Sequence, residues 1–112
     1  MYHLANPTDA SKLRTGDNYR APSLDSEGFI HCCTGTQLPG VIQRYYIDAV
    51  NLVLLHINAD LLTHQPVYEN TVGGTELFPH VYGEINATAV QNAITVDQSM
   101  LARVAASEHY QP

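Results

Sequence analysis

The sequence contains no tryptophan, and it is poor in positive charge. Its 112 residues include 5 Lys and Arg residues against 11 Asp and Glu residues, so the formal net charge is −6. Proteins that hold nucleic acid by its phosphates need a basic surface, and we therefore expect no bulk nucleic-acid binding. A few well-placed cations would still suffice to hold one small phosphorylated ligand.

A long hydrophobic segment is also missing. The longest apolar run, residues 52–55, is far shorter than the roughly 20 residues that a membrane-spanning helix needs. The amino terminus lacks the charged region and the following apolar stretch of a secretory signal, so we expect a cytoplasmic protein with no membrane partner. A hydrophobic content of 45% in a chain of this length suits one core, which predicts a single domain over residues 1–112.

The two cysteines, Cys32 and Cys33, are adjacent in the sequence. Neighbouring residues of a strand point to opposite faces of a sheet, so a disulfide between them would be strained. We interpret both as reduced thiols, as in a reducing compartment. Either thiol could act as a nucleophile, but no basic or helix-terminal setting is evident that would lower its pKa, and we expect both to be inert.

The spacing of apolar residues predicts an α+β fold. Strands are expected near residues 2–5, 28–33, 52–57, 66–70, 78–83 and 89–96. Helices are expected from about residue 7 to 14, over residues 38–45 and after Asp97, while residues 17–23 have the composition of an irregular polar loop. The run 52–57 is nearly continuous in apolar residues, so it should be central and covered on both faces. We expect a mostly antiparallel, split small sheet with two or three helices.

Two histidines lie inside short apolar segments that have the pattern of strands. His31 lies in residues 27–33 and His80 in residues 78–83. A buried imidazole costs free energy unless both ring nitrogens find partners, so two such placements suggest a polar site built on a sheet. His3 lies in the first predicted strand, and the three rings would converge if these strands were neighbours in one sheet. The alternative for each is a core histidine that is satisfied by the backbone.

Other polar residues near these segments are candidates for the same site. Glu69 is the preferred general acid or base, ahead of Glu27, although single carboxylates at strand ends are commonly solvated. Arg20 and Ser23 lie in the loop before the His31 segment, where side chains can reach a ligand. Because cations are few, Arg20 is the expected anion contact. The alternatives are a surface ion pair for Arg20 and a turn cap for Ser23.

A zinc site is a weaker reading of the same residues. Three imidazoles together with Glu69 or Glu84 would supply enough ligands for zinc and leave an open position. The sequence contains neither an HExxH nor an HxH pair, and the candidate ligands are far apart. We therefore assign no metal ligand and keep a metal-assisted hydrolase as an alternative.

Several segments together resemble the bacterial and plant family named Domain of Unknown Function 952. The segments are residues 2–3, 19–24, 27–33, Gln37, 52–58 and 78–83, and their most specific elements are EGFIHC and FPHxYG. The resemblance extends over nearly the whole chain. That family in turn resembles the ADP-ribosyltransferase-like folds, nearest the RNA 2′-phosphotransferases, which carry one histidine in the first strand and another in an HLS-type strand.

The resemblance implies roles for individual residues. His3 matches the first histidine element and would bond the ribose hydroxyls of the nicotinamide half of NAD. His31 matches the second element and would order the same ligand. Arg44 is a candidate for one of the several arginines that the phosphotransferases use. The position of the glutamate that many ADP-ribosyltransferases use falls on His80 or, less directly, on Glu84.

We therefore expect a cleft that binds a small nucleotide-type ligand, with NAD as the candidate. The leading hypothesis is a transferase acting on NAD, ADP-ribose or a phosphorylated nucleotide, and the alternatives are a non-catalytic nucleotide-binding module and a metal-assisted hydrolase. The oligomeric state is left open. The expected catalytic residues are His31, His80 and His3. The expected ligand contacts are His3, Arg20, Ser23, His31, Glu69 and Tyr82.

Overall fold

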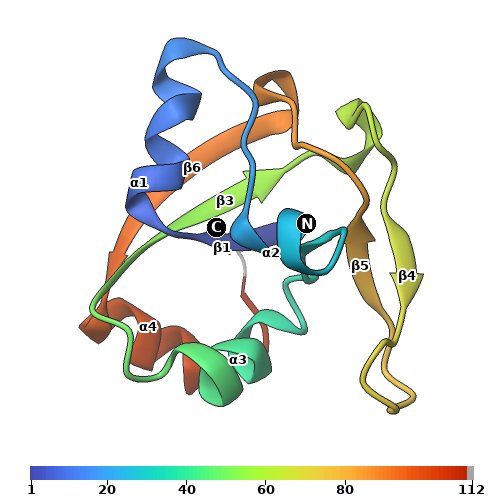
Figure 1. The fold of residues 1–112 in the computed structure, drawn as a ribbon. Helices are drawn as coiled ribbons and strands as arrows, with labels where there is room; N and C mark the ends of the chain where they lie inside the picture. Colours follow the sequence, from blue (N-terminus) through green and yellow to red (C-terminus); the bar gives the residue numbers. More distant parts are fainter. Residues whose placement is uncertain (111–112) are drawn as a thin grey trace.

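Two three-stranded antiparallel sheets organise the chain in the computed structural model, which describes residues 1–110 (Figure 1). The strand order is β1-β3-β6 in the first sheet and β2-β5-β4 in the second. The second sheet stands beside the first, with β4 and β5 at the right of Figure 1. The strands are β1 (Tyr2–Ala5), β2 (Ile30–His31), β3 (Asn51–Ile57), β4 (Val67–Glu69), β5 (Phe78–Val81) and β6 (Val90–Asp97).

Short helices connect the strands. In the described part of the chain they are α1 (Pro7–Ala10), η1 (Ser11–Thr15), α2 (Pro22–Ser26), α3 (Leu38–Val41), η2 (Ile42–Tyr46), η3 (Ala59–Leu61), η4 (Ala87–Ala89) and α4 (Gln98–Ala105). The segment η2 is a π-helical turn that continues α3 directly. Asp97 caps α4 by accepting a hydrogen bond from the Met100 amide at 2.8 Å, as the sequence predicts.

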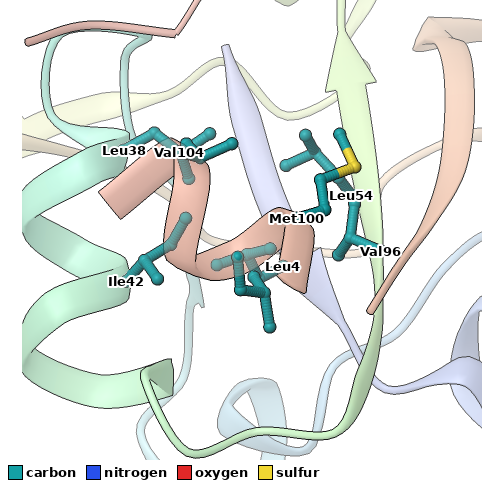
Figure 2. A pocket seen from close by; sticks show the side chains of 8 residues that line it. Leu4, Leu38, Ile42, Leu54, Val96, Met100 and Val104 are labelled. Atoms are coloured by element: carbon teal, nitrogen blue, oxygen red, sulfur yellow. The ribbon is translucent and has the colours of Figure 1, made fainter. Parts of the chain in front are cut away.

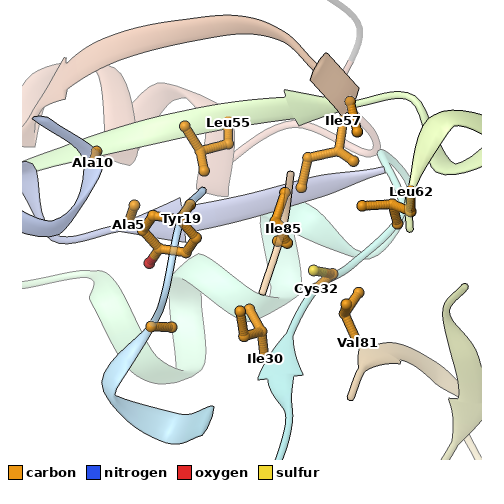
Figure 3. Packing of buried hydrophobic residues seen from close by; sticks show 12 residues of the cluster. Ala5, Ala10, Tyr19, Ile30, Cys32, Leu55, Ile57, Leu62, Val81 and Ile85 are labelled. Atoms are coloured by element: carbon orange, nitrogen blue, oxygen red, sulfur yellow. The ribbon is translucent and has the colours of Figure 1, made fainter. Parts of the chain in front are cut away.

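The central strand β3 separates two hydrophobic cores. Its side chains alternate, so that Leu55 and Ile57 enter one core while Leu54 enters the other, and all three are buried. Figure 3 shows the first core, in which Leu55 and Ile57 pack with residues of the second sheet, including Ile30 and Val81. The prediction that residues 52–57 form a central strand with both faces covered is confirmed.

The second core lies between the first sheet and the helices α3 and α4 (Figure 2). Leu38 and Ile42, on α3 and η2, pack with Leu101 of α4, and all three are at most 1% exposed. A void of about 10 Å³ remains among these apolar side chains. It is no larger than the space that one water molecule occupies, so this void is too small for a ligand.

The chain passes from one sheet to the other directly after β2. The Cys32 amide donates to Pro79 O at 3.0 Å in the second sheet, and the next amide, that of Cys33, donates to Tyr2 O at 2.9 Å in the first. The predicted strand over residues 28–33 is therefore too long: only Ile30–His31 forms regular ladder pairs, because the backbone turns away to pair with β1.

A second correction concerns residues 17–23, which were expected to be irregular. The helix α2 begins inside this segment, with Pro22 in its first turn, where the missing amide of proline costs no hydrogen bond. Gly28 follows the helix with φ of 88°, a left-handed conformation that favours glycine, and its amide lies 3.1 Å from Leu24 O. Within the described residues the chain thus has more helical segments than the two or three expected.

Both cysteines are buried and unpaired with each other, as predicted. Burial raises the pKa of the Cys33 thiol to about 12 and raises that of Cys32 as well, so neither is a thiolate at neutral pH. Among residues 1–110, no helix has both the length and the apolar character required to cross a membrane.

We predict that Leu55→Ala destabilises the fold strongly, because this fully buried side chain fills the first core from the central strand. The free energy of unfolding should fall by about 2–5 kcal/mol. Leu61→Ala is the matched control, since Leu61 is 53% exposed and its loss should change stability by less than about 0.5 kcal/mol. Urea denaturation of both variants measures the difference, and equal losses would contradict the assignment of the core.

Candidate functional site

A cavity of about 810 Å³ lies where the two sheets meet. Its walls come from β1, from the segment around β2, from η2 and from the hairpin formed by β4 and β5. The exposed side chains of Tyr45 and Val72 stand at its rim. A volume of this size falls in the range of about 300–1,000 Å³ that is usual for small-molecule sites. This cavity is the candidate functional site.

Two imidazoles lie side by side in the cavity wall. His31 of β2 and His80 of β5 are directly opposite each other in the antiparallel ladder, and their ring centroids are 5.3 Å apart. The Phe29 ring stacks on His80, with centroids 4.2 Å apart, and meets His31 edge-on at 4.8 Å. One aromatic side chain therefore fixes the orientation of both rings.

Glu69 holds His80 in one orientation. Its Oε1 lies 2.9 Å from His80 Nδ1 and also accepts a hydrogen bond from the Tyr82 hydroxyl. The hydrogen bonds from Tyr82 and then from His80 lower the pKa of Glu69, and the same contact with Glu69 raises the pKa of Tyr82. Because the carboxylate accepts, Nδ1 of His80 carries the proton, and Nε2 is the basic nitrogen of the neutral ring.

The second nitrogen of His80 has no hydrogen-bond partner among the described residues. Within residues 1–110, no protein group hydrogen-bonds His80 Nε2, and no buried polar side-chain atom lacks a partner. The side chain as a whole is only 4% exposed, and His80 is one of the residues that line the cavity. The arrangement of carboxylate, imidazole and free nitrogen is that of an oriented general base.

His31 has a carboxylate partner of its own. Its Nε2 lies 2.9 Å from Glu27 Oε2, and both side chains are 49% exposed. The left-handed turn at Gly28 brings Glu27 back toward the strand. Ser23 stabilises this turn, because its hydroxyl donates to Phe29 O at 2.8 Å. The two histidines thus form two carboxylate–imidazole pairs, one buried and one half exposed.

His3 lines the cavity but is fully engaged by the protein. Its Nδ1 donates to the carbonyl oxygen of His31 at 2.5 Å, and its Nε2 accepts from the Tyr19 hydroxyl at 2.7 Å. Burial lowers the pKa of His3 to about 4, so the ring is neutral at pH 7. His3 therefore holds the backbone of β2 in place, and a ligand would reach its nitrogens only by displacing one of these partners.

Arg44 is the cation that lines the cavity in the described part of the chain. It lies on the π-helical turn η2, a type of turn that is frequent at functional sites. Its guanidinium is 4.0 Å from Glu76 and lies 5.9 and 5.8 Å from the ring centroids of Tyr45 and Phe78. Arg44 thus spans from the helical wall toward the hairpin wall.

The loop of the hairpin is ordered by a single side chain, that of Asn70. Its Oδ1 accepts hydrogen bonds from the amides of Val72 and Gly74, and its Nδ2 donates to Glu76 O at 2.7 Å. Gln37, at the start of α3, donates to Leu77 O at 2.7 Å and joins the loop to the helical wall. The hairpin wall of the cavity is therefore held by hydrogen bonds within the protein.

The structure brings together some of the predicted site residues and leaves others outside. His3, His31, His80 and Glu69 line one cavity, although β1, which carries His3, lies in a different sheet from the strands of His31 and His80. Tyr82 reaches the site through Glu69 without lining the cavity. Ser23 does not line it either, and its hydroxyl is used in the turn before β2.

Arg20 was the expected anion contact, and its position does not fit that role. Its guanidinium pairs with Asp25 and lies 3.4 Å from Glu84, on the surface away from the cavity lining. These contacts raise the pKa of Arg20, and Arg20 lowers that of Asp25. The alternative of a surface ion pair is correct, because α2 places an acidic partner beside Arg20 that the loop prediction did not include.

The weighed zinc constellation does not assemble. Among residues 1–110, no group of three or more His, Cys, Asp or Glu side chains has the arrangement needed to hold a metal ion. Glu84 lies in the surface network of Arg20, and His3 has both nitrogens engaged. The donor set expected from the sequence is thus divided among separate hydrogen-bond networks.

Sequence reasoning underestimated two residues of the site. Glu27 was ranked below Glu69, although it is the direct partner of His31. Arg44 was noted only through the family resemblance, although it faces the cavity. The sequence does contain features that indicate both residues. Arg44 is the first Lys or Arg after the His31 segment, and Glu27 lies four residues before His31 with a glycine between them.

Comparison with known proteins identifies similar chains. A family model described as "Protein of unknown function (DUF952)" matches residues 4–93. No curated protein matches the chain. The X-ray structure of protein CC0527 from Caulobacter crescentus is similar, with a TM-score of 0.73 and 24% identity over 86% of this chain and 84% of that chain. A double mutant of the same protein gives 23% identity at the same TM-score and coverage. The two structures show the shared fold.

We predict that acid destabilises the fold through His3. Its pKa is about 4 in the folded state against 6.5 as the ordinary value, so between these values only the unfolded chain gains a proton at this residue. The free energy of unfolding should therefore fall as the pH falls from 7 toward 4, with a contribution from His3 that reaches about 3 kcal/mol. Urea denaturation at several pH values measures it.

The variant His3→Gln removes the titrating group and keeps a side chain that can hydrogen-bond. Its unfolding free energy should depend less on pH over the same range. His109→Ala, which removes an exposed histidine, should keep the dependence of the wild type. If His3→Gln and the wild type lose stability in parallel, His3 is not held neutral by the fold.

Proposed function

Since this chain belongs to the DUF952 family, we propose that its cavity binds a nucleotide-type ligand, with NAD as the candidate, and that the protein is a transferase acting on it. The observation that carries the proposal is the Glu69–His80 pair, which lines a cavity of nucleotide size and leaves one imidazole nitrogen without a hydrogen-bond partner among the described residues. The resemblance of the family motifs to ADP-ribosyltransferase-like folds suggests transfer of an ADP-ribosyl or phosphoryl group.

The charges of the cavity suit chemistry at the anomeric carbon of a ribose. Cleavage of a glycosidic bond passes through an oxocarbenium-like state, in which positive charge develops on the sugar. Glu27, Glu69 and Glu76 line the cavity, and carboxylates fixed beside a developing cation stabilise it. His80 Nε2 would take the proton of the acceptor that attacks the sugar, as a general base.

The cavity also offers contacts for the other parts of a dinucleotide. Arg44, rather than Arg20, is the proposed phosphate contact, because it lines the cavity and Arg20 does not. The rings of Tyr45 and Phe78, whose centroids lie 5.9 and 5.8 Å from the Arg44 guanidinium, are suitable surfaces for a base to stack on. In this proposal His3 acts indirectly, by holding the backbone of His31.

We predict that Arg44→Ala weakens the binding of NAD and of ADP-ribose by about 10-fold or more, because a charge-assisted hydrogen bond is worth about 1.5–3 kcal/mol. Arg20→Ala is the matched control, since it removes an arginine outside the cavity and should leave the affinity unchanged. Isothermal titration calorimetry measures both. Equal effects of the two substitutions, or no binding of either ligand to the wild type, would refute the proposed ligand site.

We predict that His80→Ala lowers turnover of NAD by about 100-fold or more, as expected for loss of a general base. Glu69→Gln should reduce turnover in the same direction, because the amide no longer fixes the ring as a carboxylate does. His109→Ala should keep the wild-type rate. The assay measures the release of nicotinamide by chromatography. Tight binding of NAD without turnover by the wild type would favour the non-catalytic binding module instead.

A further inference from the structure

We propose a second activity for the same cavity, which is the opening of a five-membered cyclic phosphodiester by water, with a ribonucleoside 2′,3′-cyclic phosphate as the substrate class. The inference depends on the proposal that the cavity accepts a nucleotide, but it requires neither NAD nor transfer of ADP-ribose. Its basis is the juxtaposition of His31 and His80, which the proposed transfer reaction uses only in part.

The two imidazoles are arranged as an acid and a base that can act on one group. They are direct cross-strand neighbours on β2 and β5 with ring centroids 5.3 Å apart, and both line the cavity. Each ring has one nitrogen on its own carboxylate, with His31 Nε2 on Glu27 and His80 Nδ1 on Glu69. A displacement at phosphorus needs one proton removed and another delivered on opposite sides of the same atom.

The second nitrogen of each ring is free to transfer a proton. Within residues 1–110, neither His31 Nδ1 nor His80 Nε2 hydrogen-bonds a protein group. The environments of the rings differ, because the side chain of His80 is 4% exposed and that of His31 is 49% exposed. A buried ring fixed by a carboxylate suits the base, and a solvent-accessible ring that can exchange its proton suits the acid.

The ring opening requires no metal, no oxidant and no substrate other than the cyclic phosphate and water. Neutral His80 removes a proton from water through Nε2, and the water oxygen forms a bond to phosphorus. The bond from phosphorus to one ring oxygen breaks, and that oxygen receives a proton from protonated His31. The product is a nucleoside phosphomonoester, and exchange of protons with solvent restores both rings.

The charge of the cavity favours release of the product. Three carboxylates line the cavity, those of Glu27, Glu69 and Glu76, against the single guanidinium of Arg44. A cyclic phosphodiester carries one negative charge, which Arg44 can offset. The phosphomonoester that is formed carries nearly two negative charges at neutral pH, so the carboxylates repel the product more strongly than the substrate and promote its release.

The test is an assay of the full chain with adenosine 2′,3′-cyclic phosphate in the presence of a chelator, with the products separated by chromatography. We expect formation of an adenosine monophosphate above the rate in buffer and no opening of the six-membered ring of adenosine 3′,5′-cyclic phosphate. His80→Ala and His31→Ala should each lower the rate by about 100-fold or more. His109→Ala should have no effect.

Each outcome bears on the proposal. Because His80 is buried, its replacement can disturb the fold, so His31→Ala at the half-exposed position is the decisive variant, with circular dichroism as a check of folding. The absence of any cyclic phosphate opening, a rate that is retained in His31→Ala, or activity that disappears with the chelator would overturn the inference.

The two proposals for this cavity fail in different ways. Binding of NAD without cyclic phosphate opening would overturn the inference and leave the nucleotide site intact. Cyclic phosphate opening without binding of NAD would support the inference and remove NAD as the ligand.

Discussion

The hydrogen bond from His3 to the carbonyl oxygen of His31 is the interaction on which the site depends. His3 belongs to the first sheet and His31 to the second, so this bond, together with the bridge between Tyr2 and Cys33, fixes one sheet against the other. The Tyr19 hydroxyl occupies the other nitrogen of His3. A buried imidazole with both nitrogens satisfied is stable, and the cavity forms beside this junction.

The same junction divides the hydrophobic residues between two cores. Ile30 and Cys32 enter the core between the sheets, whereas Cys33 enters the core under α3 and α4. The alternation of side chains along one short segment therefore serves both cores, and His31, between them in sequence, is left on the face that opens to the cavity. The polar position within the apolar run is a consequence of this change of sheet.

The approximate positions of most strands could be predicted from the sequence, because the alternation of apolar residues indicates the two faces of a strand. The three histidines could be chosen as candidates because imidazoles are unusual in apolar segments, but that their strands belong to two different sheets could not be predicted. The sequence could not show which of Arg20 and Arg44 lines the cavity. Whether an arginine reaches a cavity depends on where its helix sits and which acids lie beside it, as Asp25 does beside Arg20. The spacing of residues in the sequence also cannot predict side-chain roles that depend on tertiary neighbours, such as the hydrogen bond that Ser23 makes in a turn.

The side chain of Asn70 organises the hairpin loop from within, and Gln37 joins the loop to α3. One wall of the cavity is consequently assembled before anything enters it. Binding of a ligand would not have to offset the entropic cost of ordering that wall, so more of the contact energy would appear as affinity. Occupancy should then change the backbone little, and the empty and occupied forms of this protein should superimpose closely along the hairpin.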